Sequence, residues 1–181
     1  MLTALAITAM LLTATMVATD ASFKAYAQTA AQASTQAATR MVTHRLMSMV
    51  RTSTAHGPLM PDAGAQPPIT LNGDTITSNF LELVDSRNNL VRVEYRVQEQ
   101  ELWATITPLA GGAATSQPLL AGVTDCTFFA HRRVSEGNVF VLERATMDLT
   151  AQPPADATVE LENGKPRPVR VVASTMPRQL E

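Results

Sequence analysis

The side chains that could carry out chemistry are few and far apart in the sequence. The only histidines are His44, His56 and His131, and none forms a His-x-x-x-His pair or has a cysteine at metal-ligand spacing. Cys126 is the single cysteine, so it cannot form an internal disulfide, and cysteine usage indicates no redox compartment. It lies between Thr and Asp in a predicted strand, which favours a core side chain over a nucleophile. We therefore expect no metal ligand and no thiol catalyst.

The acidic residues make no better case for acid–base catalysis. Asp125, Asp148, Glu160 and Glu162 are best interpreted as solvated positions on strand faces, because no spacing pairs two of them. The Gly111-Gly112 pair lacks the strand-to-helix context of a phosphate-binding loop. No Gly-x-Ser-x-Gly elbow and no dense Asp/Asn calcium loop is present. We expect no catalytic residue and no cofactor, and hence a protein that is not an enzyme.

The elements that must carry the function begin with a stretch without helix breakers. Residues 1–56 contain neither Gly nor Pro, whereas the whole chain has 8 Gly and 11 Pro. Since these residues are the strongest helix breakers, the stretch predicts one long helix from Met1 to His56. At about 1.5 Å per residue, this helix would run roughly 80 Å. Something other than its own domain must bury part of it.

The predicted helix has two chemically different halves. Residues 1–19 carry no charge and would span about 28 Å, close to the roughly 30 Å hydrocarbon core of a bilayer. Their threonine hydroxyls can bond back to carbonyls one turn earlier. Residues 20–56 are polar and amphipathic. The apolar side chains that we expect to enter a membrane or a filament core are Leu2, Leu5, Ile7, Met10, Leu11, Leu12, Met16 and Val17.

A stripe of small and apolar residues follows the second half at three-to-four spacing, which is typical of one helix face. Its members are Phe23, Ala27, Ala30, Ser34, Ala37 and Met41. Val42, Leu46, Met49 and Val50 widen the stripe in the last turns. We expect these last turns to offer an apolar face on which a domain docks.

The rest of the chain alternates short strand patterns with turn signals and shows no second helix. The strands are predicted at residues 69–71, 76–84, 90–97, 102–107, 119–131, 139–150, 158–161 and 169–175, with a flexible loop at 108–118. Val91, Val93, Tyr95 and Val97 should share one face of the clearest strand. The expected fold is α+β, with the long helix (1–19 apolar, 20–56 amphipathic), a connector (57–68) and a small antiparallel β-sheet domain (69–181).

The charge of the chain argues against nucleic acid as a partner. The formal net charge is -2 and the pI is near 5.9, whereas phosphate binding needs a basic face. Arg40, His44, Arg45 and Arg51 form a small basic patch that is more typical of a solvated helix face.

A long helix, apolar and then amphipathic, that leads into a small β domain resembles the type IV pilin-like proteins. Residues 1–18 (MLTALAITAMLLTATMVA) are similar to the interior of a class III, prepilin-type signal. The downstream chain is similar to the J-type minor pseudopilins of type II secretion and their PilW-like relatives. The residues that carry this likeness are Val93-Glu94-Tyr95-Arg96-Val97, Glu101-Leu102-Trp103, Leu119-Leu120-Ala121-Gly122-Val123 and Phe128-Phe129.

The resemblance implies a non-enzymatic minor subunit of a type II secretion pseudopilus or a type IV pilus tip, which supports protein secretion or pilus biogenesis. Its implied partners are other pilin-like subunits and, where an upstream leader exists, the prepilin peptidase. The subunits would contact one another by helix packing, in which small residues allow a close approach. The implied location is a single pass through the inner (cytoplasmic) membrane, with the β domain on the periplasmic side.

Members of the family begin with a basic leader, a Gly at the cleavage point and a Phe-Thr-Leu-Val-Glu start. Met1 falls where the residue after that Glu would be, so we expect in-frame codons upstream of Met1 to encode this stretch. A stop codon immediately before Met1 would contradict the expectation.

Other interpretations of the first 56 residues stay open. An A-x-A site at Ala25-Tyr26-Ala27 would suit a cleaved secretory signal, although no Lys or Arg precedes the apolar run. A single-span anchor fits the length, and would leave an adhesion or recognition domain that does not assemble. A buried core helix is disfavoured, because 19 uncharged residues have no partner in so short a chain.

Overall fold

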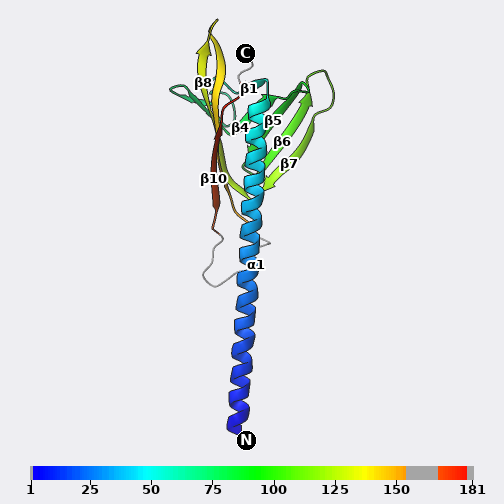
Figure 1. Cartoon of the computed structure of the whole chain (residues 1–181), viewed down its shortest axis with the longest axis vertical. Coiled ribbons are helices and arrows are strands. Elements are labelled where there is room, and N and C mark those ends of the chain that lie inside the picture. Colours follow the sequence, from blue (N-terminus) through cyan, green and yellow to red (C-terminus); the bar gives the residue numbers. More distant parts are fainter. Residues whose placement is uncertain (1, 154–166, 179–181) are drawn as a thin grey trace.

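A single unbroken helix precedes all the strands. The computed structural model describes residues 2–153 and 167–178. Helix α1 (Leu2–Thr52) is 51 residues long, and its N-terminal half projects from the rest of the molecule (Figure 1). Within the described residues, two five-stranded antiparallel sheets follow it. The predicted α+β class, a long N-terminal helix followed by antiparallel strands, is confirmed.

The two sheets are each built from strands that are neighbours by hydrogen bonding. In spatial order the first sheet contains β1 (Ala55–Gly57), β4 (Phe80–Val84), β5 (Asn89–Arg96), β6 (Glu101–Pro108) and β7 (Thr115–Ala121). The second contains β10 (Val169–Thr175), β9 (Val139–Ala151), β8 (Val123–Ser135), β3 (Thr75–Ser78) and β2 (Thr70–Asn72).

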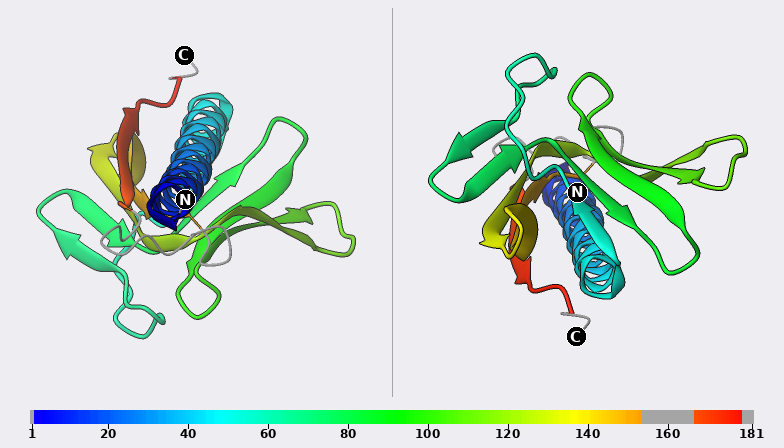
Figure 2. Two further views of the ribbon diagram at one scale, coloured as in Figure 1. Left: turned by 90° about the horizontal axis from the view of Figure 1, so that it is seen from below. Right: turned by 90° about the horizontal axis from the view of Figure 1, so that it is seen from above.

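The C-terminal half of α1 lies in the angle between the two sheets, as the view along the helix makes clear (Figure 2). It packs lengthwise against β10, β9 and β7. Leu46 and Val50 enter the main core, where they meet Leu83 and Val93 of the first sheet and Met147 of the second. The predicted docking of the last helical turns on the β domain is therefore confirmed.

The side of α1 that faces the domain is not the predicted stripe of small and apolar residues but a row of threonines. Thr35, Thr39 and Thr43 are buried, each four residues from the next, and they continue into Leu46 and Val50. At 100° per residue these positions lie nearly opposite the predicted stripe. The stripe itself points to solvent, with Phe23 70% and Met41 73% exposed and only Ala27 half-buried among its members.

The helix ends four residues earlier than predicted. Ser53 still makes a helical hydrogen bond, from its backbone N–H to the carbonyl oxygen of Met49 at 3.0 Å, but the backbone N–H of Thr54 donates to the Val84 carbonyl oxygen of β4 at 3.0 Å instead of to Val50. His56 then donates from Nε2 to the carbonyl oxygen of Val50, 2.7 Å away. The chain thus leaves the helix at Thr52, and His56 lies in β1, a strand that was not predicted from the sequence.

Two predicted strands are each divided between the two sheets. The segment 76–84 breaks at Asn79, whose side-chain amide donates to the Tyr95 carbonyl oxygen at 3.2 Å, so β3 and β4 pair in different sheets. The segment 119–131 breaks at Gly122, which has a φ of 73° that an L side chain rarely adopts. Strand β7 begins at Thr115, inside the predicted loop.

The other predicted strands within the described residues are present at about the expected positions, and one side chain is placed differently. Val91, Val93 and Tyr95 are buried as expected, but β5 ends at Arg96 and leaves Val97 64% exposed. The last predicted strand appears as β10, and the predicted strand at 158–161 lies outside the described residues.

The connector at 57–68 is held to the β8–β9 hairpin by one buried cation. The Arg132 guanidinium donates to the carbonyl oxygen of Leu59 and lies 3.9 Å from the centre of the Phe140 ring. Leu59 and Ala65 pack on a second, smaller core cluster around Ile76.

Candidate functional site

The projecting half of α1 presents its apolar side chains to the outside on every face. Leu2 belongs to the helix, and its side chain lies outside the described residues. The others named from the sequence, Leu5, Ile7, Met10, Leu11, Leu12, Met16 and Val17, are between 59 and 73% exposed. Helix α1 is long and apolar enough to cross a membrane as a single span.

The hydroxyl groups of Thr8, Thr13 and Thr15 in this half are satisfied within the helix itself. Thr8, Thr13 and Thr15 donate to carbonyl oxygens four residues earlier, at 3.1, 2.9 and 3.1 Å. Each hydroxyl therefore needs no partner outside its own helix, as predicted. The first charged residues, Asp20 and Lys24, pair at 2.8 Å and mark the end of the uncharged segment.

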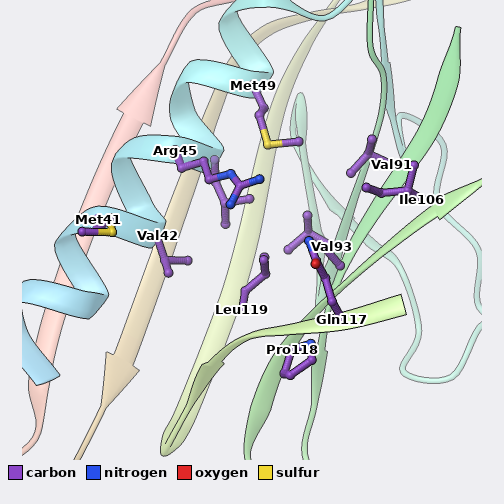
Figure 3. A pocket seen from close by; sticks show the side chains of 12 residues that line it. Met41, Val42, Arg45, Met49, Val91, Val93, Ile106, Gln117, Pro118 and Leu119 are labelled. Carbon is purple, nitrogen blue, oxygen red and sulfur yellow. The ribbon is translucent and has the colours of Figure 1, made fainter. Parts of the chain in front are cut away.

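A narrow apolar groove of about 250 Å³ lies between α1 and strands β5, β6 and β7. Figure 3 shows Val42, Arg45 and Met49 extending from the helix toward the sheet strand that carries Val93, whereas Met41 lies at the outer margin of the groove. Among the described residues that line the groove, Arg45 is the one charged side chain. The groove offers hydrophobic contact and a single cation, and no acid–base pair.

The candidate chemical groups are dispersed rather than brought together. The Nδ1 atom of His131 is hydrogen-bonded to the Thr75 hydroxyl, 3.1 Å away, and its Nε2 atom lies 3.4 Å from Oε2 of Glu143. Asp148 forms a two-point ion pair with Arg170 across β9 and β10, at 2.9 and 2.6 Å, and this pairing lowers the pKa of the Asp148 carboxyl.

Cys126 is buried at 2% exposure among core side chains, and this burial raises the pKa of its thiol. His44 is exposed on α1, and His56 caps the helix at the far end of the molecule. Within residues 2–153 and 167–178, no three His, Cys, Asp or Glu side chains gather as a metal site. Glu160 and Glu162 lie outside the described residues.

Two features of the structure were not found from the sequence. One is the threonine face of α1, which its four-residue spacing could have revealed. The other is a cleft of about 560 Å³ at the end of the domain, lined by residues from three separate segments. No local sequence signal joins those segments.

No protein-family model matches this chain, and no curated protein matches its sequence. The geometry of α1 and the β domain therefore carries the functional argument.

Proposed function

We propose that this chain is a non-enzymatic, pilin-like minor subunit that assembles with other pilin-like subunits through its N-terminal helix. In this proposal it serves a type II secretion pseudopilus or a type IV pilus tip. Before assembly the apolar half spans the inner membrane, and the β domain lies on the periplasmic side. In both settings the uncharged segment is hidden from water, which is the environment that its composition requires.

One observation carries the proposal: the apolar half and the domain-bound half are the same continuous helix. No Gly or Pro interrupts residues 2–52, and the second half is fixed in the angle between the sheets. The direction of the apolar half is thereby fixed relative to the domain. A flexible tether would suffice for a simple anchor, whereas a subunit packed in a filament needs a defined orientation.

A second observation supports packing against other helices. The small-residue stripe lies on the side of α1 away from the domain, where Ala30, Ser34 and Ala37 are exposed. Small residues let helix backbones approach closely, and the domain does not cover them.

The test is to scramble the order of residues 3–19 at constant composition in the native host. A filament core depends on specific packing, so we expect membrane insertion to persist while secretion or piliation is lost. Unchanged secretion and piliation with the scrambled segment would leave the single-span anchor as the better account. Fractionation of the membranes checks insertion independently of function.

A further inference from the structure

The end of the domain that lies farthest from the helix N-terminus holds a cleft of mixed character. Its walls come from the segment after α1, from the β8–β9 hairpin and from the residues that follow β10. Leu59, Phe140 and Leu142 supply apolar surface, and Arg133 and Arg178 supply two guanidinium groups. Figure 1 shows the hairpin and the C-terminal segment at this end.

The two guanidinium groups are available to a ligand. Within the part of the chain that the structure describes, neither Arg133 nor Arg178 pairs with a carboxylate, and no acidic residue lines the cleft. Both side chains belong to exposed residues. The cleft is therefore cationic, although the whole chain has a formal net charge of -2.

The C-terminal end of helix α1 lies beside the cleft, and its carbonyl groups could compete with a ligand for the guanidinium groups of Arg133 and Arg178. Three of the last-turn carbonyl oxygens of α1 accept hydrogen bonds from backbone N–H groups and from the side chains of Ser53 and His56. Met49 O accepts from Ser53, Val50 O accepts from His56, and Arg51 O accepts from the backbone N–H of Arg178. The negative end of the helix is thus capped, and both guanidinium groups stay free to bind an anion.

We propose that this cleft binds a partner polypeptide segment in which a carboxylate stands beside apolar side chains. The carboxylate would accept charge-assisted hydrogen bonds from Arg133 and Arg178, and the apolar neighbours would cover Leu59 and Phe140. The two cations and the apolar side chains that line the cleft together favour a peptide with both acidic and apolar residues. The cleft is open, three segments border it, and it lies away from the apolar half of α1, where an extended chain can enter.

The inference does not depend on filament assembly, and its test is made on dispersed single chains. The full-length protein is placed in phosphatidylcholine nanodiscs, which carry no net lipid charge. A capped peptide of alternating Glu, Leu and Phe is titrated by calorimetry. We expect saturable binding that weakens between about 50 and 500 mM NaCl, because the contact is partly ionic.

Two comparison peptides separate the components of recognition. Replacing Glu by Gln removes the carboxylates, and replacing Leu and Phe by Ser removes the apolar contacts. Each change should weaken binding by about tenfold or more. Equal binding of the Gln peptide would overturn the proposal, and so would full displacement of the peptide by decanoate, which would assign the cleft to a small amphiphile.

Variants then locate the site. The double variant Arg133→Gln/Arg178→Gln should weaken binding about tenfold, whereas Arg40→Gln/Arg144→Gln, which changes the charge equally at exposed positions outside the cleft, should stay within about twofold. Ser135→Asp, which introduces a carboxylate into the lining, should also weaken it. Unchanged binding in the first double variant, or an equal loss in the second, would overturn the assignment.

Discussion

The hydroxyl of Tyr95 on β5 donates a hydrogen bond to the carbonyl oxygen of Thr124 on β8, 2.9 Å away, and so links the two sheets. The same hydroxyl lies 3.3 Å from the carbonyl oxygen of Val123. Asn79 contacts the Tyr95 backbone on the other side, at the point where β3 passes into β4. One tyrosine thus holds both crossings between the sheets.

Replacing Tyr95 by Phe should therefore destabilise the protein while keeping the ring in the core. The change leaves the Thr124 carbonyl without its donor, at a cost of about 1–2 kcal/mol in the free energy of unfolding. Thermal or urea unfolding of the detergent-solubilised protein measures it. Tyr26→Phe is the matched control, because Tyr26 is 76% exposed on α1 and should shift stability by less than about 0.5 kcal/mol.

His56 should make stability depend on pH. Burial lowers the pKa of its imidazole, and the hydrogen bond to the Val50 carbonyl offsets this only in part. Between the folded pKa and the unfolded value near 6.5, the unfolded chain binds more protons. The free energy of unfolding should therefore fall as pH drops below about 6.5 and level off below the folded pKa.

Unfolding measured from pH 8 to pH 4.5 checks this expectation. His56→Gln should flatten part of the slope, whereas His44→Gln, at an exposed position, should leave it unchanged. If the free energy of unfolding falls with decreasing pH equally in wild type and His56→Gln, the titration of another group governs the loss of stability at acid pH.

The buried hydroxyl of Thr43 should be replaceable with a gain in stability. Thr43 is 5% exposed, and its Oγ1 has no hydrogen-bond partner within the described residues. Thr43→Val keeps the shape and removes a desolvated polar group, so we expect a gain of about 1 kcal/mol in the free energy of unfolding. Thr39→Val is the control. The Thr39 hydroxyl donates to the Thr35 carbonyl oxygen at 2.7 Å, so this change removes a hydrogen bond and should not bring the same gain in stability. A gain of equal size in both variants would point to helix–sheet packing rather than to the unpaired hydroxyl.

Charges placed on the small-residue stripe should impair assembly without unfolding the domain. Ala30→Glu and Ala37→Glu put carboxylates on the exposed side of α1, where a neighbouring helix would approach. Secretion or piliation in the native host should fall at least about tenfold, with the melting temperature unchanged. Gln36→Glu adds the same charge at an exposed position away from the stripe and should have little effect. Loss of function in all three variants would indicate a general charge effect instead.

The properties that the sequence encodes locally were predicted well. The absence of Gly, Pro and charge predicts the apolar half of α1, and the alternation around Val93 predicts β5. Features that depend on contacts distant in sequence were missed. The helix was expected to reach His56, because no breaker precedes Gly57, but the Thr54 backbone N–H donates to the Val84 carbonyl oxygen of β4, and His56 takes the Val50 carbonyl oxygen, so the helix ends earlier.

The division of strands between the two sheets was missed for a similar reason. Gly122 and Asn79 each lie within a segment that was predicted as one continuous strand, and tertiary pairing decides that the chain changes sheets there. The distal cleft could not be predicted, since Arg133 and Arg178 are far apart in the sequence and line the same cleft only in the folded domain.

The lengthwise packing of α1 against β9 and β10 has a mechanical consequence. A pull on the apolar end, directed along the helix axis, loads the contacts from Thr35 to Val50 in parallel, so the interface is sheared as a whole. Peeling would instead break the same contacts one after another at a lower force. The domain is thus attached to α1 in a geometry that resists a pull along the helix axis better than it would resist peeling.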